Sequence, residues 1–130
     1  MAGYSITHVN DVPDVSGDYP GEIRMATEHI GAEQVALTYR RMAPNTGGKG
    51  SYGHRHRTQE ETLYVISGTV EVKLEDEVVE AGPGTIVRIA PETLRSVWNE
   101  GPEDAELILV SHRLVDQSNE VELVDGFWPA

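Results

Sequence analysis

The sequence predicts an all-β domain in which short antiparallel strands form a sandwich or a barrel. Short runs of β-forming residues recur at regular spacing, with turn-forming residues between them. In residues 69–74, polar and apolar side chains alternate with a period of two, which is typical of a strand with one buried face. No segment shows the 3.6-residue periodicity of a long helix, and 130 residues suffice for one domain with its own core.

The chain is expected to begin with an arm, residues 1–34, that has few fixed elements. Residues 1–21 are rich in Gly, Pro, Asp and Ser, which favour turns and loops. Residues 21–31 fit either one short helical turn or a short strand, and their pattern does not decide between the two.

The barrel itself is predicted over residues 35–115. A first strand at 35–42 consists of β-forming residues and ends before Pro44, and a glycine-rich loop follows it. Further strands are predicted at 61–68, at 85–91, from 95 onward and at 106–115, with a hairpin over 69–84. The acidic tail, 116–130, is expected to pack on the barrel through Phe127 and Trp128, because the chain has few aromatic residues.

The composition narrows the possible partners and chemistry. The 22 acidic and 10 basic residues give a formal net charge of −12, which opposes binding to nucleic acid or to an anionic membrane. Cysteine is absent, which excludes disulfides, thiolate metal ligands and a cysteine nucleophile. The N-terminus lacks the basic start and apolar run of a signal peptide, and no stretch has the roughly 18 apolar residues of a membrane span, so a cytoplasmic protein is expected.

Two histidines one residue apart form the strongest candidate for a chemical site. Residues at positions i and i+2 of a strand point to the same face, so His54 and His56 can converge on one ion. Together with a carboxylate, two imidazoles suit Zn, Fe, Ni, Mn or Cu and leave coordination positions open for a substrate. A pair of solvent-exposed loop histidines is the alternative interpretation.

The carboxylate is either Glu60 or Glu61. On one uninterrupted strand, Glu60 would share the face of His54 and His56. Residues 57–60 are polar, however, and lack strand-like alternation, so a turn or bulge there changes which of the following side chains point to the face of the histidines. Such a change favours Glu61.

The spacing around the histidine pair resembles the first signature motif of the cupin superfamily, G-x5-H-x-H-x3,4-E-x6-G. The spacing to the last glycine selects Glu61 over Glu60. The resemblance implies that two histidines and this glutamate bind one divalent transition metal, such as Fe, Mn, Zn or Ni. The five motif positions are occupied by Gly48, His54, His56, Glu61 and Gly68.

The second cupin motif, G-x5-P-x-G-x2-H-x3-N, is matched only in part. Gly84 and Asn99 occupy its two ends, whereas Arg95 stands where the resemblance places a histidine as the fourth metal ligand. Arginine stays protonated in proteins and cannot ligate a metal. Either the three remaining ligands hold the metal and Arg95 binds an anionic substrate, or no metal binds and Arg95 pairs with Glu61 or Glu60.

Two of these candidates have plainer interpretations. Arg95 could be a solvated residue at a strand end, although it shares a face with Val97 and the motif alignment turns that face inward. His112 shares a face of the last predicted strand with Ile108 and Val110. We expect His112 in the core or in an interface, and a substitute metal ligand is the alternative.

The resemblance implies a jelly-roll barrel with the site inside it, and a homodimer in which the arm could pair across the interface. Cupins include metal-dependent dioxygenases, isomerases and lyases as well as ligand-binding domains without catalysis, so the fold does not decide the function. Three functions therefore stay open. They are a metal-dependent enzyme for a small oxygenated substrate, a metal-free pocket for a small polar or anionic molecule, and a partner-binding domain that has lost the site.

Overall fold

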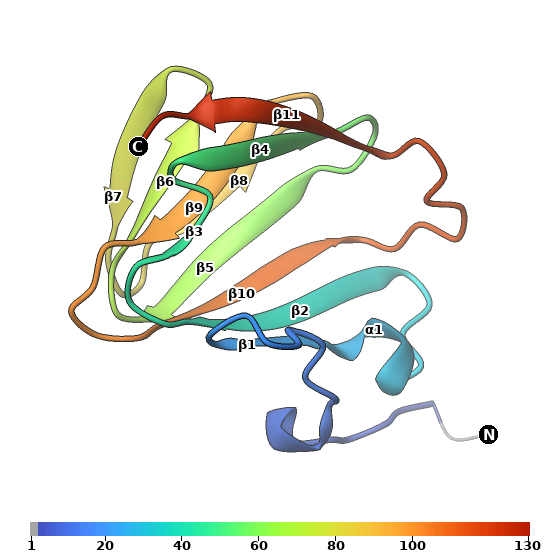
Figure 1. The fold of residues 1–130 in the computed structure, drawn as a ribbon. Helices are drawn as coiled ribbons and strands as arrows, with labels where there is room; N and C mark the ends of the chain where they lie inside the picture. Colours follow the sequence, from blue (N-terminus) through green and yellow to red (C-terminus); the bar gives the residue numbers. More distant parts are fainter. Residues whose placement is uncertain (1–2) are drawn as a thin grey trace.

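The computed structural model describes residues 3–130 and consists of two antiparallel sheets that face each other (Figure 1). The five-stranded sheet has the order β1-β2-β10-β5-β8, and the six-stranded sheet has the order β11-β4-β9-β6-β7, with β3 paired to β9. This arrangement confirms the predicted all-β fold of jelly-roll type.

The elements have the following bounds. The strands are β1 (Glu22–Met25), β2 (Val35–Met42), β3 (Thr46–Gly47), β4 (Ser51–His56), β5 (Glu61–Ser67), β6 (Val70–Leu74), β7 (Glu77–Ala81), β8 (Ile86–Ile89), β9 (Arg95–Asn99), β10 (Ala105–His112) and β11 (Val121–Trp128). Within residues 3–130, helical structure is limited to the 3-10 turn η1 (Val9–Asp11) and the single turn α1 (Ala26–His29). None of the helical segments in this range is long and apolar enough to cross a membrane.

Strands with a clear sequence pattern form where they are predicted. β2 has the predicted bounds, and β6 and β7 form the predicted hairpin. The hairpin turns at Glu75, whose φ of 53° is the left-handed conformation that a tight two-residue turn requires. Val70 and Val72 point into the interior with 1% and 0% of their surface exposed, as the alternation requires.

Two edge strands, β1 and β11, form in segments where the sequence predicts none with certainty, and the short strand β3 forms within the predicted glycine-rich loop. Residues 21–31 contain both elements that their pattern allows, because β1 pairs with β2 and the helical turn α1 follows at once. In the tail, β11 pairs with β4 and extends the six-stranded sheet. Both are edge strands, and most residues of β11 are exposed, so apolar alternation is weak in them and periodicity does not reveal them.

The aromatic pair at the end of β11 packs against the six-stranded sheet. Trp128 is 5% exposed, and the Nζ atom of Lys73 lies 3.9 Å from the centre of the Phe127 ring. Gly53 on β4 makes room for this ring, since a Cβ atom there would lie 2.3 Å from Phe127 Cδ2 and 2.8 Å from the carbonyl oxygen of Arg95. The tail therefore packs directly against the strand that carries the two candidate histidines.

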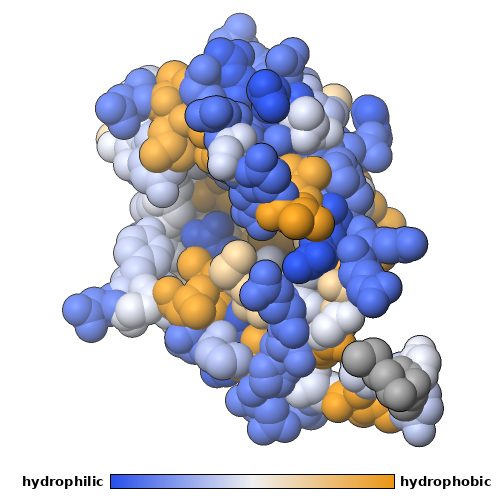
Figure 2. Space-filling view, turned by 90° about the vertical axis from the view of Figure 1, so that its right-hand side faces the viewer, coloured by the Kyte–Doolittle hydropathy of each residue, from blue (hydrophilic) through white to orange (hydrophobic). Residues whose placement is uncertain are grey.

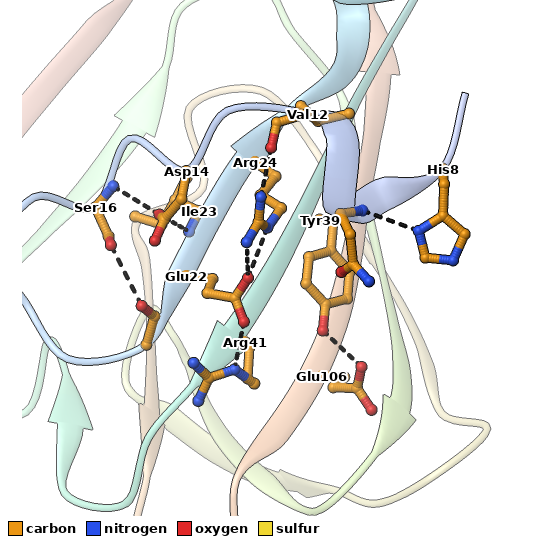
Figure 3. Close-up of polar contacts among 12 residues, drawn as sticks. His8, Val12, Asp14, Ser16, Glu22, Ile23, Arg24, Tyr39, Arg41 and Glu106 are labelled. Carbon is orange, nitrogen blue, oxygen red and sulfur yellow. Dashed lines mark hydrogen bonds and ion pairs between the residues drawn. The ribbon is translucent and has the colours of Figure 1, made fainter. Parts of the chain in front are cut away.

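Polar contacts fasten the arm to the five-stranded sheet (Figure 3). Glu22 on β1 accepts a hydrogen bond of 2.7 Å from Nε of Arg41 on β2, and it also pairs with Arg24. Arg24 in turn donates to the carbonyl oxygen of Val12 at 2.5 Å. These contacts join the arm to the sheet in addition to the backbone ladder between β1 and β2.

The interior is divided between a packed core and a cavity. The cavity has a volume of about 430 Å³, and Leu63 borders both the cavity and the core. Figure 2 shows a hollow near the centre of one side of the molecule, where hydrophobic and hydrophilic surfaces meet. The fully buried core residues are Met42, Leu63, Val65, Val70, Val72, Ala81, Ala105 and Leu107.

Candidate functional site

The structure brings His54, His56 and Glu61 together. The two histidines lie on β4 with their ring centres 5.3 Å apart and their planes at 71°. Glu61 begins β5 in the opposite sheet. One ligand atom from each of the three half-buried side chains lies within 4.8 Å of the other two.

The loop between β4 and β5 explains why Glu61, and not Glu60, joins the histidines. Because this loop crosses from one sheet to the other, the face of His54 does not continue along the chain to Glu60. Glu60 is exposed and accepts a hydrogen bond of 2.6 Å from Nε of Arg88, which is also exposed. Glu61 instead lines the cavity together with Leu63.

Arg95 lies inside the barrel and faces the same group. It begins β9, pairs in register with His54, and is only 1% exposed. Its Nη2 atom lies 3.4 Å from Glu61 Oε1, and its Nη1 atom donates to the carbonyl oxygen of Thr93 at 2.9 Å. Its buried Nε atom has no hydrogen-bond partner within residues 3–130.

Burial lowers the pKa of both basic groups that face each other here, whereas neighbouring charges act differently on the two. Burial lowers the pKa of Arg95, and the negative charge of Glu61 raises it, so the guanidinium stays charged. Burial and, after it, the positive charge of Arg95 lower the pKa of His54 to about 4. His54 is therefore neutral at pH 7, which is the form that donates a lone pair to a metal.

His56 is backed by a carboxylate that the sequence analysis does not single out. Glu120, which precedes β11 and is 5% exposed, places Oε2 3.3 Å from Nδ1 of His56, outside hydrogen-bond geometry. It accepts hydrogen bonds from the Thr58 amide at 3.0 Å, the Thr58 hydroxyl at 2.7 Å and the Gln59 amide at 2.9 Å. Burial raises the pKa of Glu120, but the bonds from Thr58 and Gln59 outweigh it and lower the pKa to about 2.

His112 does not join the group. It is the last residue of β10, and its side chain is exposed. Its carbonyl oxygen accepts a hydrogen bond of 2.7 Å from Nε2 of Gln59, so its backbone supports the loop between β4 and β5.

The donor set fits a divalent transition metal. Nitrogen and oxygen ligands lie about 2.0–2.2 Å from such an ion, so two of them are at most about 4.4 Å apart around it. The spacing of 4.8 Å or less in this structure is therefore closed by a small inward movement of the side chains. Two imidazoles and one carboxylate leave further coordination positions open.

Arg40 is a second cavity residue that the sequence analysis does not single out. It lies on β2 and lines the cavity together with Arg95, His54 and Glu61. In the sequence, the face with Leu37 and Tyr39 is the more apolar face of β2, so periodicity turns Arg40 outward. The arm explains the reversal, because it covers that apolar face and leaves the face with Arg40 for the interior.

Comparison with known proteins identifies the family. A family model described as "Cupin domain" matches residues 40–111, and no curated protein matches the chain. The polyketide cyclase RemF from Streptomyces resistomycificus is 22% identical and superposes with a TM-score of 0.71, over 92% of this chain and 89% of that chain. A cupin protein from Bacteroides fragilis is 16% identical, with a TM-score of 0.71 over 89% of each chain.

A third solved structure, from Thermotoga maritima, is described as a predicted oxalate decarboxylase. It is 17% identical, with a TM-score of 0.65 over 84% of this chain and 99% of that chain. At these identities the similarity of the three structures concerns the fold alone. The family match covers more than half of the residues, and this chain therefore belongs to the cupin domain family.

Proposed function

We propose that this cupin binds a small anionic molecule in its barrel cavity, next to a divalent transition metal held by His54, His56 and Glu61. The observation that carries the proposal is the convergence of these three ligands within 4.8 Å, with His54 and Glu61 lining the same cavity as a buried arginine. When bound, a metal such as Fe, Mn, Zn or Ni would polarise a small oxygenated substrate as a Lewis acid.

The residues of the chain have separate tasks in this proposal. His54 supplies a neutral imidazole, and Glu61 supplies a carboxylate that reduces the charge of the ion. Arg95 cannot ligate the metal, but its guanidinium can form paired hydrogen bonds to a carboxylate or a phosphate. Its unpartnered Nε atom is one donor available for that purpose.

The reaction classes that suit such a site are dioxygenase, isomerase and lyase chemistry on a small oxygenated substrate. The solved structures with this fold include a polyketide cyclase and a protein described as a predicted oxalate decarboxylase. These names support the range of chemistry that a cupin cavity accommodates, and the substrate of this chain is a separate question.

Metal content tests the proposal directly. Wild-type protein is stripped with a chelator, incubated with Fe(II), Mn(II), Zn(II) or Ni(II), dialysed, and analysed by mass spectrometry. We expect about one ion per chain, and its loss in the double variant His54→Ala/His56→Ala. The matched control is His112→Ala, which removes an exposed histidine and should leave the metal content unchanged. Wild-type protein that stays empty with all four metals would contradict the metal part of the proposal.

One observation favours a second candidate, a metal-free pocket in which Arg95 replaces the ion. The contact of 3.4 Å between Arg95 Nη2 and Glu61 Oε1 supplies a positive charge to the carboxylate without a metal. In that case the stripped protein binds small anions as well as the metal-treated protein does, and Arg95→Met abolishes this binding. Anion binding that requires added metal would exclude this candidate.

A further inference from the structure

Arg40 projects into the barrel although most of its neighbours there are apolar. The register of the five-stranded sheet places Arg40 opposite Ile23 on β1 and opposite Leu107 on β10. Directly opposed residues share a face of a sheet, and Leu107 is fully buried in the core. Arg40 and Ile23 both line the cavity, so the side chain of Arg40 is directed to the interior of the barrel.

Arg40 also lacks the acidic partner that almost every other arginine of the chain has. The sequence contains eight arginines, and within residues 3–130 only Arg40 and Arg57 have no carboxylate oxygen within 4.0 Å. Arg57 is exposed, where water solvates its charge. Arg40 is half-buried, where an unpaired charge is costly. The six arginines with a partner are Arg24, Arg41, Arg55, Arg88, Arg95 and Arg113.

The charges that line the cavity do not cancel. Arg40 and Arg95 are positive, and Glu61, which already contacts Arg95, is the one carboxylate among the lining residues. Glu120, behind His56, adds a second negative charge near Arg95. Arg40 is therefore the cation of the cavity that no carboxylate of the described residues balances within 4.0 Å, and an anionic group of a ligand would balance it.

Two tyrosines share the cavity wall with Arg40. Tyr19 and Tyr52 both line the cavity. The Tyr19 hydroxyl oxygen accepts a hydrogen bond of 2.8 Å from the Gly47 amide, which leaves its own O–H free to donate. Arg40 on β2 and Arg95 on β9 come from opposite sheets and line the same cavity.

We infer that the physiological ligand carries two anionic groups, one bound by Arg95 and the other by Arg40 with Tyr19. A short dicarboxylate has this chemistry and is small enough for a cavity of about 430 Å³. This inference rests on the proposed anion-binding function and adds its ligand class, with Arg40 as the specificity-determining residue.

Isothermal titration calorimetry with a length series of dicarboxylates, malonate to adipate, tests the inference against matched monocarboxylates such as butyrate. The metal-stripped full chain is used first, so that a metal cannot bind the second carboxylate. We expect at least one dicarboxylate to bind wild type at least tenfold more tightly than butyrate does. Arg40→Met should abolish this preference and leave the affinity for butyrate within about twofold, whereas Arg95→Met should weaken both ligands.

Two further variants keep the test interpretable. Arg57→Met removes the exposed arginine and should change neither affinity. Arg40→Lys keeps the charge without the planar fork, should retain part of the preference, and replaces Arg40→Met if circular dichroism shows that the latter does not fold.

The possible failures separate the inference from the function on which it rests. Equal affinity of wild type for every dicarboxylate and for butyrate would overturn the inference and leave anion binding in place. A preference for dicarboxylates that survives in Arg40→Met would overturn the role of Arg40. Failure of all these anions to bind, with or without reloaded metal, would overturn both the inference and the proposed anion-binding function.

Discussion

At the scale of single residues, Glu120 lies beside a candidate metal ligand, His56, although the two are distant along the chain. Glu120 holds the loop between β4 and β5 by accepting three hydrogen bonds from Thr58 and Gln59. Its Oε2 atom also lies 3.3 Å from Nδ1 of His56. A carboxylate that accepts a hydrogen bond from a ligating histidine orients the ring and raises its basicity, and Glu120 is the carboxylate placed to do so once His56 binds a metal.

Glu120→Gln is predicted to weaken metal binding and to destabilise the fold. Both backbone amides donate to the same oxygen of Glu120, so the carbonyl oxygen of glutamine can accept both, but its amide nitrogen cannot accept from the Thr58 hydroxyl. The charge-assisted hydrogen bonds of the carboxylate are also replaced by weaker neutral ones. We expect a loss of about 1–3 kcal/mol in the free energy of unfolding and a weakening of metal affinity by about tenfold or more. Denaturant unfolding and metal titration measure the two effects.

Glu122→Gln is the matched control for this prediction. Glu122 lies on β11, two residues after Glu120, and pairs with Arg55 on the exposed surface. Exposed ion pairs contribute only about 0–1 kcal/mol, so this variant should change stability little and metal affinity not at all. Equal effects of the two variants would contradict a special role for Glu120.

At the scale of elements, β1 depends on side-chain charge as well as on its backbone ladder. The hydrogen bonds from Arg41 and then Arg24 lower the pKa of Glu22. A carboxylate whose pKa is lowered in the folded state stabilises that state above its ordinary pKa, here 4.5, and loses this contribution as the pH falls below it. The anchorage of the arm should therefore weaken in acid.

We predict that β1 opens more readily below pH 4.5 while the central strands stay protected. Hydrogen exchange measured between pH 6 and pH 3, and corrected for intrinsic rates, should show protection falling in β1 before it falls in β5. In Glu22→Gln the protection of β1 should already be lower at pH 6, and its pH dependence should be reduced. Parallel changes of β1 and β5 in wild type would indicate global unfolding and would contradict the prediction.

At the scale of the whole molecule, the outer face of the five-stranded sheet is unusually apolar. Ile86 is 66% exposed, and Tyr64, Ile66 and Val110 on the same face are between 36% and 41% exposed. Beside them, the arm and the sheet enclose a second, mainly apolar cavity of about 600 Å³. A surface of this kind commonly marks a contact between proteins.

The homodimer that the sequence analysis expects remains a prediction, and this face is where we would test it. Light scattering during gel filtration should give twice the chain mass of 14.3 kDa for wild type. Ile86→Glu should shift the mass to that of one chain, because it buries a charge in the interface. Leu123→Glu on β11 is the control, since Leu123 is equally exposed, at 62%, but lies in the other sheet. A monomeric wild type would refute the expectation.

Sequence reasoning succeeded where a local pattern carries the information. The spacing from His54 through Glu61 to Gly68 selects three side chains that the fold places around one point. The spacing is informative because the motif spans a strand, a loop and the next strand in consecutive residues. Gly68 belongs to the pattern for a local reason as well, since its φ of 72° is strained for any residue with a Cβ atom.

Sequence reasoning failed where the decisive neighbour is distant along the chain. Nothing near Glu120 indicates that it reaches Thr58, which lies 62 residues earlier. The pattern of β2 even points the wrong way for Arg40, because both faces of this strand are covered and alternation reports only relative hydrophobicity. The edge strands β1 and β11 escape detection for a related reason, since hydrogen bonds to a neighbouring strand hold them more than a buried apolar face does.

The sequence by itself therefore determined the all-β class, the cupin resemblance, the central strands and the candidate ligands His54, His56 and Glu61. Only the tertiary structure decided that Arg95 reaches Glu61, that Arg40 shares the same cavity, and that Glu120 supports the histidine strand. The physical reason is the range of the interactions. Strand periodicity and motif spacing are set by neighbours along the chain, whereas the charge balance of a cavity is set by side chains that the two sheets bring together.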